Sequence, residues 1–345
     1  TRLTKNYTER RNRVKEALID LSVLIVFFNR PQTLKKVFER VKEARPARLF
    51  LYQDGPRENR PDDIENVKKC REIVADVDWQ CEVHTLYQEK NQGVDPSGYL
   101  ADTWAFSLTD KCLVLEDDVV PSLSYFSFVK KMLDEYENDE RIMLISGMNL
   151  QEKTPVNSDY FFSKMTITMA WASWRRVVEK WDGEYSFLKD ENKVRQLKKY
   201  IKDNKLVKNT VKLMQKHAES GVAHFETVLI ANQYFHDGLS IVPSKNMCVN
   251  IGAVPDSSHS ASELKYVQRG YKRIFTMKTY EMNCDEIRAP EEVKDYKKYK
   301  KTVYYVHGWN RPVLRALRFA EVCLKKIFTG KAKEAFADIG SKFKK

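Results

Sequence analysis

Continuous apolar runs recur along the first 150 residues at intervals of about 30 residues, the length of one βαβ unit. These runs occupy residues 21–28, 48–53, 81–86, 112–115 and 141–146. Segments with helical periodicity lie between them, at residues 32–44, 62–75, 96–108 and 122–136. Strands that are apolar on both faces are typical of a parallel sheet covered by helices on both sides. The pattern therefore predicts an open, mostly parallel α/β sheet.

Polar and charged residues follow four of the predicted strands directly. They are Asn29-Arg30-Pro31, Asp54-Gly55-Pro56-Arg57, Asn91-Gln92-Gly93 and Glu116-Asp117-Asp118. In open α/β sheets ligands bind beyond the carboxyl ends of the strands. These four segments are therefore expected to share one ligand-binding edge.

The acidic triplet after the run at 112–115 is the strongest chemical signal. Crowded carboxylates at the end of a buried strand repel one another and resist burial. A hard divalent cation removes both penalties, and Mg²⁺ typically takes one or two carboxylates together with phosphate oxygens and water. The triplet predicts a metal–diphosphate site; a solvated acidic turn is the alternative.

Other nucleotide and hydrolase motifs are missing from the sequence. There is no Gly-x-x-x-x-Gly-Lys-Ser/Thr run, and no Gly-x-Gly-x-x-Gly follows the first strand. No Gly-x-Ser-x-Gly elbow occurs either. Carboxylates and an arginine at the strand ends remain, a set that suits a nucleoside diphosphate held through a metal.

The second half of the chain has a different character. Residues 170–176 combine two tryptophans with two arginines and are expected to begin a helix, and from about residue 260 the chain becomes basic and aromatic. We expect a charged N-terminal segment (1–20), a catalytic domain (21–260, with halves 21–150 and 151–260) and a C-terminal extension (261–345). The six cysteines form no Cys-x-x-Cys pair and are expected to be reduced thiols of a cytosolic protein.

The extension carries much of the net charge of +12. Residues 311–345 hold ten Lys/Arg and three Asp/Glu, a balance of +7, and apolar residues recur among them at helical spacing: Leu314, Leu317, Ala320, Leu324 and Ile327. A basic amphipathic helix favours an anionic membrane surface. A helix docked on the domain with a solvated lysine face explains the pattern equally well. Nucleic acid is disfavoured because no recognition motif accompanies the charge.

Eight short motifs, in this order, resemble those of bacterial glycosyltransferases with the GT-A fold (family 2-like) and, distantly, eukaryotic N-acetylglucosaminyltransferase I. The resemblance covers about residues 21–260. The motifs are Phe27-Phe28-Asn29-Arg30-Pro31, Gln53-Asp54-Gly55-Pro56-Arg57, Asn91-Gln92-Gly93, Leu115-Glu116-Asp117-Asp118, Ile145-Ser146-Gly147, Trp171-Ala172-Ser173-Trp174-Arg175-Arg176, Gly238-Leu239-Ser240-Ile241-Val242-Pro243 and Asn250-Ile251-Gly252.

The resemblance implies roles for the matching residues. Asp118 would bind Mn²⁺ or Mg²⁺ at the diphosphate, and Glu116 and Asp117 would contact ribose or metal-bound water. Asp54 would accept from the uracil imide, with Arg30 and Asn91 also beside the nucleotide. His259 would close over the diphosphate or complete the metal shell.

The general base is expected to be a carboxylate, because inverting transfer needs one group to take the acceptor proton. The family commonly has a Trp-Asp pair where this chain has Phe225-Glu226, so Glu226 is the first candidate, followed by Asp237 and Asp182. One of Trp171 and Trp174 is expected to line the sugar site and the other to lie in the core.

The resemblance thus implies a metal-dependent, inverting transferase that moves sugar from a nucleotide donor, such as a UDP-sugar, to a glycan or lipid-linked acceptor. Bacterial relatives of this kind make surface polysaccharides, so a cytoplasmic location, peripheral on the inner membrane face, is expected. A sugar nucleotidyltransferase and a non-catalytic glycan- or nucleic-acid-binding protein are the alternatives.

Overall fold

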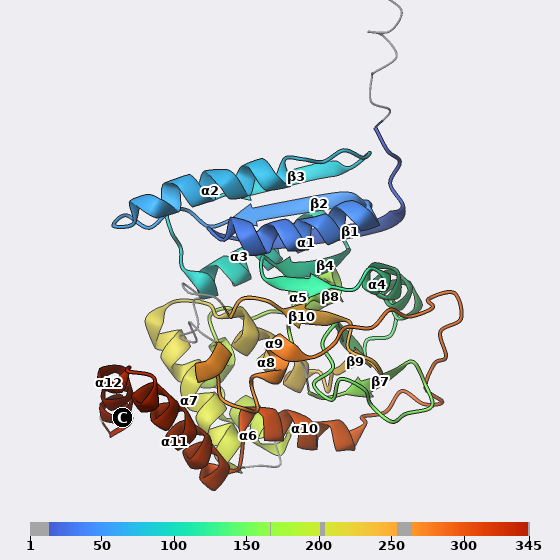
Figure 1. The fold of residues 1–345 in the computed structure, drawn as a ribbon. Coiled ribbons are helices and arrows are strands. Elements are labelled where there is room, and N and C mark those ends of the chain that lie inside the picture. The colour runs from blue at the N-terminus through green and yellow to red at the C-terminus, as the bar shows by residue number, and fades with distance from the viewer. Residues whose placement is uncertain (1–13, 166, 201–203, 254–263, 344–345) are drawn as a thin grey trace, which may run out of the picture.

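An eight-stranded sheet organises the protein (Figure 1). The computed structural model describes residues 14–165, 167–200, 204–253 and 264–343. The strands lie in the order β3 (Glu82–Tyr87), β2 (Pro46–Gln53), β1 (Ile19–Phe27), β4 (Lys111–Glu116), β8 (Trp171–Trp174), β6 (Ile142–Ser146), β9 (Leu239–Pro243) and β7 (Tyr160–Ser163). β8 is antiparallel to both neighbours and β7 is antiparallel to β9, whereas the other pairs are parallel.

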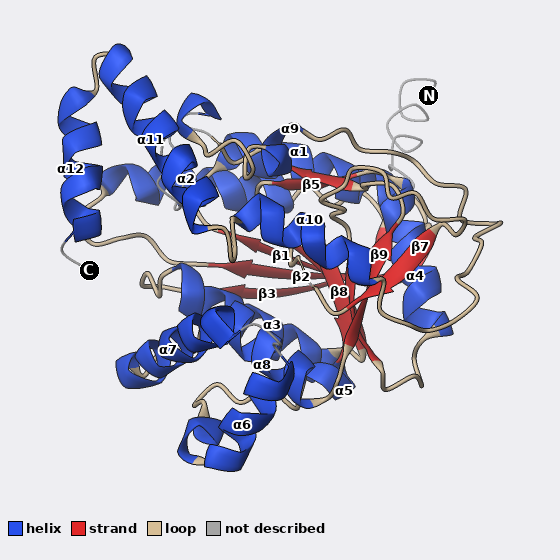
Figure 2. Ribbon diagram, turned by 90° about the horizontal axis from the view of Figure 1, so that it is seen from below, coloured by secondary structure: helices blue, strands red, loops and turns tan. Residues whose placement is uncertain are grey.

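Each face of the sheet has its own hydrophobic core, because successive side chains of a strand point to opposite faces. Val23 and Ile25 of β1 pack with α1 (Pro31–Ala44), α2 (Pro61–Val74) and α4 (Ser124–Glu135). Leu24 belongs to the other core. That core contains residues of α3 (Val94–Leu108), α6 (Glu191–Tyr200), α7 (Asn204–Ser220) and α8 (Phe225–Phe235). Figure 2 shows these helices on the two sides of the fanned strands.

The α/β architecture predicted from the sequence is confirmed. Each of the five predicted strands and four predicted helices of the first 150 residues agrees with an element of the structure to within two residues at either end. The prediction that a helix begins at residue 170 was wrong. Trp171–Trp174 forms the strand β8, and only the short helix α5 (Arg175–Val178) follows it.

A two-stranded ribbon lies beside the main sheet, formed by β5 (Val119–Pro121) and β10 (Cys248–Asn250). β5 begins immediately after the acidic triplet, so the pairing brings residues 250–252 back against it. The backbone N–H of Ile251 donates to the carbonyl of Asp118 at 2.7 Å. The ribbon therefore connects the two halves of the chain at the predicted site.

The core continues past the predicted domain boundary at residue 260. Ile274 of α9 (Arg273–Thr276) and Tyr299 and Val303 of α10 (Lys297–His307) are buried in the same cluster as β1 and α1. After the short helix η2 (Leu264–Tyr266), a projecting part begins only at α11 (Pro312–Phe328), followed by α12 (Ala332–Phe343) (Figure 1). Within the described residues, no helix has the length and apolar character needed to cross a bilayer.

Candidate active site

The site lies where the chain reverses its direction across the sheet. From β1 the chain proceeds through β2 to β3, and it then returns to place β4 on the other side of β1. The carboxyl ends of β1 and β4 therefore border a topological switch point, where α/β sheets bind ligands. Arg30 follows β1 and the acidic triplet begins at the end of β4, so both predicted segments meet there.

Arg30 joins the two strand ends. Its guanidinium donates to Asp118 Oδ2 at 2.8 Å and forms a second ion pair with Asp117. Pro31 occupies the first turn of α1, where the missing N–H costs nothing, and this fixes Arg30 at the start of the helix. One cation thus bridges two of the three consecutive carboxylates.

Glu116 lies close to several other carboxylates. Burial raises the pKa of Glu116 well above its usual range, and the nearby charges of Asp118, Glu226 and Asp117 raise it further. Burial also raises the pKa of Asp117 to about 6, although Arg30 and the N–H of Phe28 oppose this shift. The site therefore brings several carboxylates close together, an arrangement that a bound cation would stabilise.

Asp118 is held by the ribbon as well as by Arg30. Its Oδ1 accepts from the side-chain amide of Asn250 at 3.0 Å. Asn250 in turn accepts at its own Oδ1 from the N–H of Gly252, at 2.7 Å. A Cβ atom on Gly252 would lie 2.0 Å from Asp118 Oδ2, so only glycine allows this approach. Asn250 and Gly252 belong to a motif of the resemblance, but their contact with Asp118 could not be predicted from that motif.

A divalent ion at this site would have to be held partly by oxygens from outside the chain. Among the described residues no cluster of three or more His, Cys, Asp or Glu side chains could hold a metal by itself. Mg²⁺, however, commonly binds one or two carboxylates and completes its shell with phosphate oxygens and water. Asp118 and Glu116 are the carboxylates that would hold it. His259, the other predicted ligand, lies outside the described residues.

Glu226 reaches the same site from the second half of the chain. It lies in the first turn of α8, and its charge raises the pKa values of both Glu116 and Tyr271. Phe225 beside it packs over Gly98 of α3, where a Cβ would stand 2.7 Å from the ring. His224 Nδ1 also lies 3.2 Å from Asp95 of α3. These contacts fix the start of α8 against α3 and hence direct Glu226 toward the acids.

Tyr271 is a site residue that the sequence analysis missed. It lies between η2 and α9 with 38% of its surface exposed, and its partial burial, followed by the charges of Glu226 and Glu116, raises its pKa. Its ring packs edge-on against His307 with centroids 5.6 Å apart. No motif marks this tyrosine, and its placement depends on the C-terminal part folding back over the strand ends.

Asp54 has other partners than the one expected. Its Oδ1 accepts from the N–H groups of Gly55 (2.8 Å) and Gln92 (2.7 Å). Its Oδ2 accepts from Asn91 Nδ2 (2.8 Å) and the N–H of Gly93 (3.1 Å). A carboxylate offers about four lone-pair sites, so an additional uracil contact would have to replace one of these bonds. Asp54 and Asn91 hold the 88–93 loop beside the end of β2.

A second acid, Asp63 of α2, organises the ends of β1 and β2. It is completely buried and accepts from Asn29 Nδ2 (2.6 Å) and from Arg57 Nε (2.6 Å) and Nη2 (2.8 Å). These bonds, those from Arg57 first, lower its pKa below the usual range. Asp63 was not singled out from the sequence, because it resembles an ordinary acidic residue in the first turn of a helix.

Several predicted residues lie elsewhere. Asp237 precedes β9 and forms an ion pair with Lys164. It therefore lies at the amino ends of the parallel strands, whereas Asp118 lies at their carboxyl ends. Asp182 accepts from Ser186 Oγ at 2.7 Å and closes a local turn. Trp171 and Trp174 are at most 2% exposed, so the expectation that one of them lines the sugar site was wrong. Trp171 stacks against Phe225 and Phe106 in the core.

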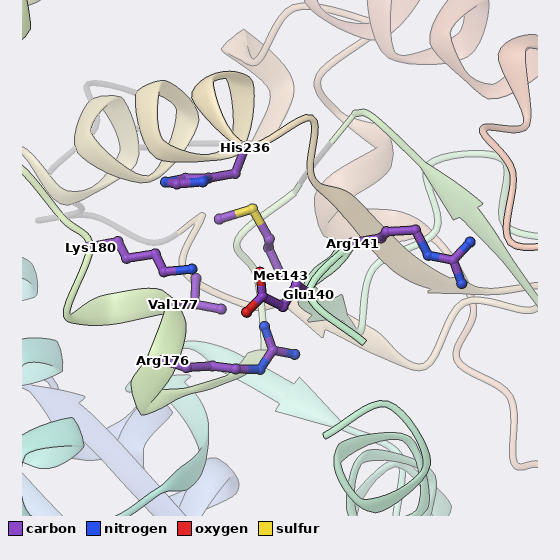
Figure 3. A pocket seen from close by; sticks show the side chains of 7 residues that line it. All are labelled: Glu140, Arg141, Met143, Arg176, Val177, Lys180 and His236. Carbon is purple, nitrogen blue, oxygen red and sulfur yellow. The ribbon is translucent and has the colours of Figure 1, made fainter. Parts of the chain in front are cut away.

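Two of the hollows in the described part of the chain border the sheet. A cavity of about 140 Å³ is surrounded by Glu140, Arg141, Met143, Arg176, Val177, Lys180 and His236 (Figure 3). It lies at the amino ends of β6 and β9, away from the acids, and Arg176 is committed there to backbone carbonyls such as that of Ile142. A larger open hollow of about 660 Å³ borders the ends of β2 and β3, on the acid-bearing edge. Its lining is Pro56, Ile64, Val67, Lys68, Arg71, Tyr87, Gln88 and Glu89.

Comparison of the sequence with models of protein families and with curated proteins finds no match.

Proposed function

We propose that the protein is a metal-dependent, inverting glycosyltransferase with a GT-A fold that uses a nucleoside diphosphate sugar. The observation that carries this proposal is the meeting of Arg30, Asp117 and Asp118 at the switch point. Arg30 and a carboxylate-bound cation together suit the two phosphates of such a donor. The motifs shared with GT-A enzymes favour a UDP-sugar as the donor and a glycan or lipid-linked oligosaccharide as the acceptor.

In the proposed reaction the acceptor hydroxyl attacks the anomeric carbon from the side opposite to the diphosphate. Glu226 takes the hydroxyl proton as the new C–O bond forms and the bond from the anomeric carbon to the phosphate oxygen breaks. A divalent cation, when bound, would neutralise the charge that develops on the leaving diphosphate. Arg30 orients the phosphates, and Asp117 holds Arg30 in place. The configuration at the anomeric carbon is inverted.

Glu226 supports this assignment better than Asp237 does. Its charge acts on Glu116, whereas Asp237 lies beyond the other end of β9, a five-residue strand that spans roughly 17 Å. Glu226 also lies in the first turn of a helix, where the helix dipole stabilises negative charge.

The direct test is a donor screen that measures nucleotide release from UDP-, GDP- and CMP-sugars, with and without Mn²⁺. We expect Mn²⁺-dependent release from one donor class, increased by a glycan acceptor. A sugar nucleotidyltransferase would instead consume a nucleoside triphosphate and release pyrophosphate. If no donor is turned over but glycans bind, the protein is a binding module and the proposal fails.

A further inference from the structure

The helix α11 turns its apolar side to solvent. Val313 is 71% exposed, Leu317 64%, Leu324 53% and Phe328 84%. Together with exposed Ala320, these residues follow one another at intervals of three or four and so lie on one face of the helix. We call this face the apolar stripe. Phe336 of α12 is also 65% exposed.

The side of α11 that packs on the protein carries Arg318 and Cys323, whereas the apolar stripe faces away from it. Arg318 is 5% exposed and donates through Nη1 to the carbonyls of Tyr305 and Val306, at 2.9 and 3.0 Å, at the end of α10. Lys326 donates to Asp338 of α12 at 2.7 Å. A helix docked through the apolar stripe would bury the stripe residues instead. Packing of the stripe against the described residues therefore does not explain the pattern at 311–345.

We infer that the apolar stripe inserts into the surface of an anionic lipid membrane. Amphipathic helices that lie in the membrane interface combine large apolar side chains with a cationic environment. Arg311, Arg315 and Lys333 are exposed on the same pair of helices, and residues 311–345 carry a net charge of +7. A second copy of the chain would bring the same positive charge to the stripe, whereas anionic lipid complements it.

The projecting helices lie on the side of the molecule toward which β1 and β2 point. Figures 1 and 2 both show α11 and α12 on the side of the arrowheads of these strands, the edge that carries Arg30 and Asp118. A membrane bound by the stripe would therefore face the same side as the candidate active site. The inference itself rests on exposure and charge and is independent of the reaction catalysed.

The test is co-sedimentation of the full chain with vesicles of phosphatidylcholine, pure or mixed with phosphatidylglycerol, in the absence of any donor. The double variant Leu317→Glu/Leu324→Glu replaces two stripe residues with good helix formers. Leu108→Glu is the matched control, since Leu108 is 52% exposed at the end of α3. Leu317→Ala/Leu324→Ala removes apolar surface without adding charge.

We expect the wild type and Leu108→Glu to bind the mixed vesicles, and less strongly as salt increases. The double glutamate variant should bind at least about tenfold more weakly. Burial of one leucine side chain contributes a free energy that corresponds to about a tenfold change in affinity or more. The double alanine variant should lie between them. Equal binding by wild type and the glutamate variant would overturn the inference, as would equal wild-type binding to pure phosphatidylcholine. A wild-type dimer without lipid, dissociated by the glutamate variant in analytical ultracentrifugation, would assign the stripe to self-association instead.

Discussion

Gly252 supports Asp118 by having no side chain, since a Cβ atom there would lie 2.0 Å from Asp118 Oδ2. The glycine comes from β10's end and the aspartate from the end of β4, so two segments separated by more than a hundred residues meet at one carboxylate oxygen. The position of this oxygen therefore depends on the β5–β10 ribbon, and a small change in the ribbon can be used to examine the site.

Gly252→Ala is expected to lower turnover about 10²-fold, because a displacement of about 1 Å at a reacting centre can cost that much. The carboxylate itself remains, so the loss would report position alone. Gly340→Ala is the control, as nothing lies within 4 Å of the Cβ it would add. Steady-state kinetics with the donor found in the screen measures the effect. Wild-type turnover in Gly252→Ala would show that the close approach has no role in activity.

Asp118→Asn is expected to abolish transfer and to leave the fold intact. The substitution keeps the size of the side chain but removes the charge that would hold the cation and pair with Arg30. Circular dichroism and turnover in saturating Mn²⁺ are the measurements. Asp110→Asn serves as the control, since its side chain is 79% exposed. Undiminished wild-type turnover in excess EDTA would contradict metal dependence.

Glu226→Gln is expected to reduce the maximal rate by about 10² or more, the usual contribution of a general base. Donor affinity should change little, because the amide keeps the size of the side chain and the donor phosphates bind elsewhere. Asp237→Asn should retain full activity, because Asp237 lies at the opposite end of the strands from the acids. If the activities of these two variants were reversed, the base would have to be reassigned to Asp237.

Arg30→Met is expected to destabilise the fold by about 3 kcal/mol at pH 8, because breaking a buried ion pair leaves a charge without its partner. The loss should be smaller at pH 5. Burial raises the pKa of Asp117 to about 6 with Arg30 present, and removal of Arg30 raises it further. An acid whose pKa is higher in the folded than in the unfolded state destabilises the fold as pH rises through this interval.

Urea denaturation of wild type and Arg30→Met at both pH values measures this difference. At pH 5 the Asp117 carboxyl of the variant is neutral in the folded state, so its burial without Arg30 costs little. Arg40→Met, whose ion pair with Glu43 is exposed, should change the free energy of unfolding by no more than about 1 kcal/mol at either pH. An equal loss at pH 5 and pH 8 for Arg30→Met would mean that the effect does not arise from Asp117.

The first half of the fold could be predicted because a helix separates each strand from the next, so that the strands recur at the interval of one βαβ unit. β8 could not, since its four residues run directly into the Arg175–Val178 helix and Trp171 and Trp174 have helical spacing. Both tryptophans are buried because β8 pairs with a neighbour on each side. Local spacing contains no information about such pairings.

The candidate site likewise contains some residues that could be predicted from the sequence and others that could not. Arg30 and the acidic triplet could be predicted because each follows a recognisable strand. Asn250, Gly252 and Tyr271 are brought to the site by segments whose own sequences do not indicate where they pack. The orientation of α11 was also inaccessible, since a periodic pattern identifies an apolar face without showing whether that face is docked or exposed.

The position of β8 affects how the chain folds while it is being synthesised. β8 separates β4 from β6, so a nascent chain that has left the ribosome only as far as residue 150 has no partner for the outer edge of β4. Unpaired edges of apolar strands pair readily with other chains. A fragment that ends at residue 150 should therefore aggregate, although it contains the whole β1–β4 unit. The two halves suggested by the change in sequence pattern depend on each other to fold.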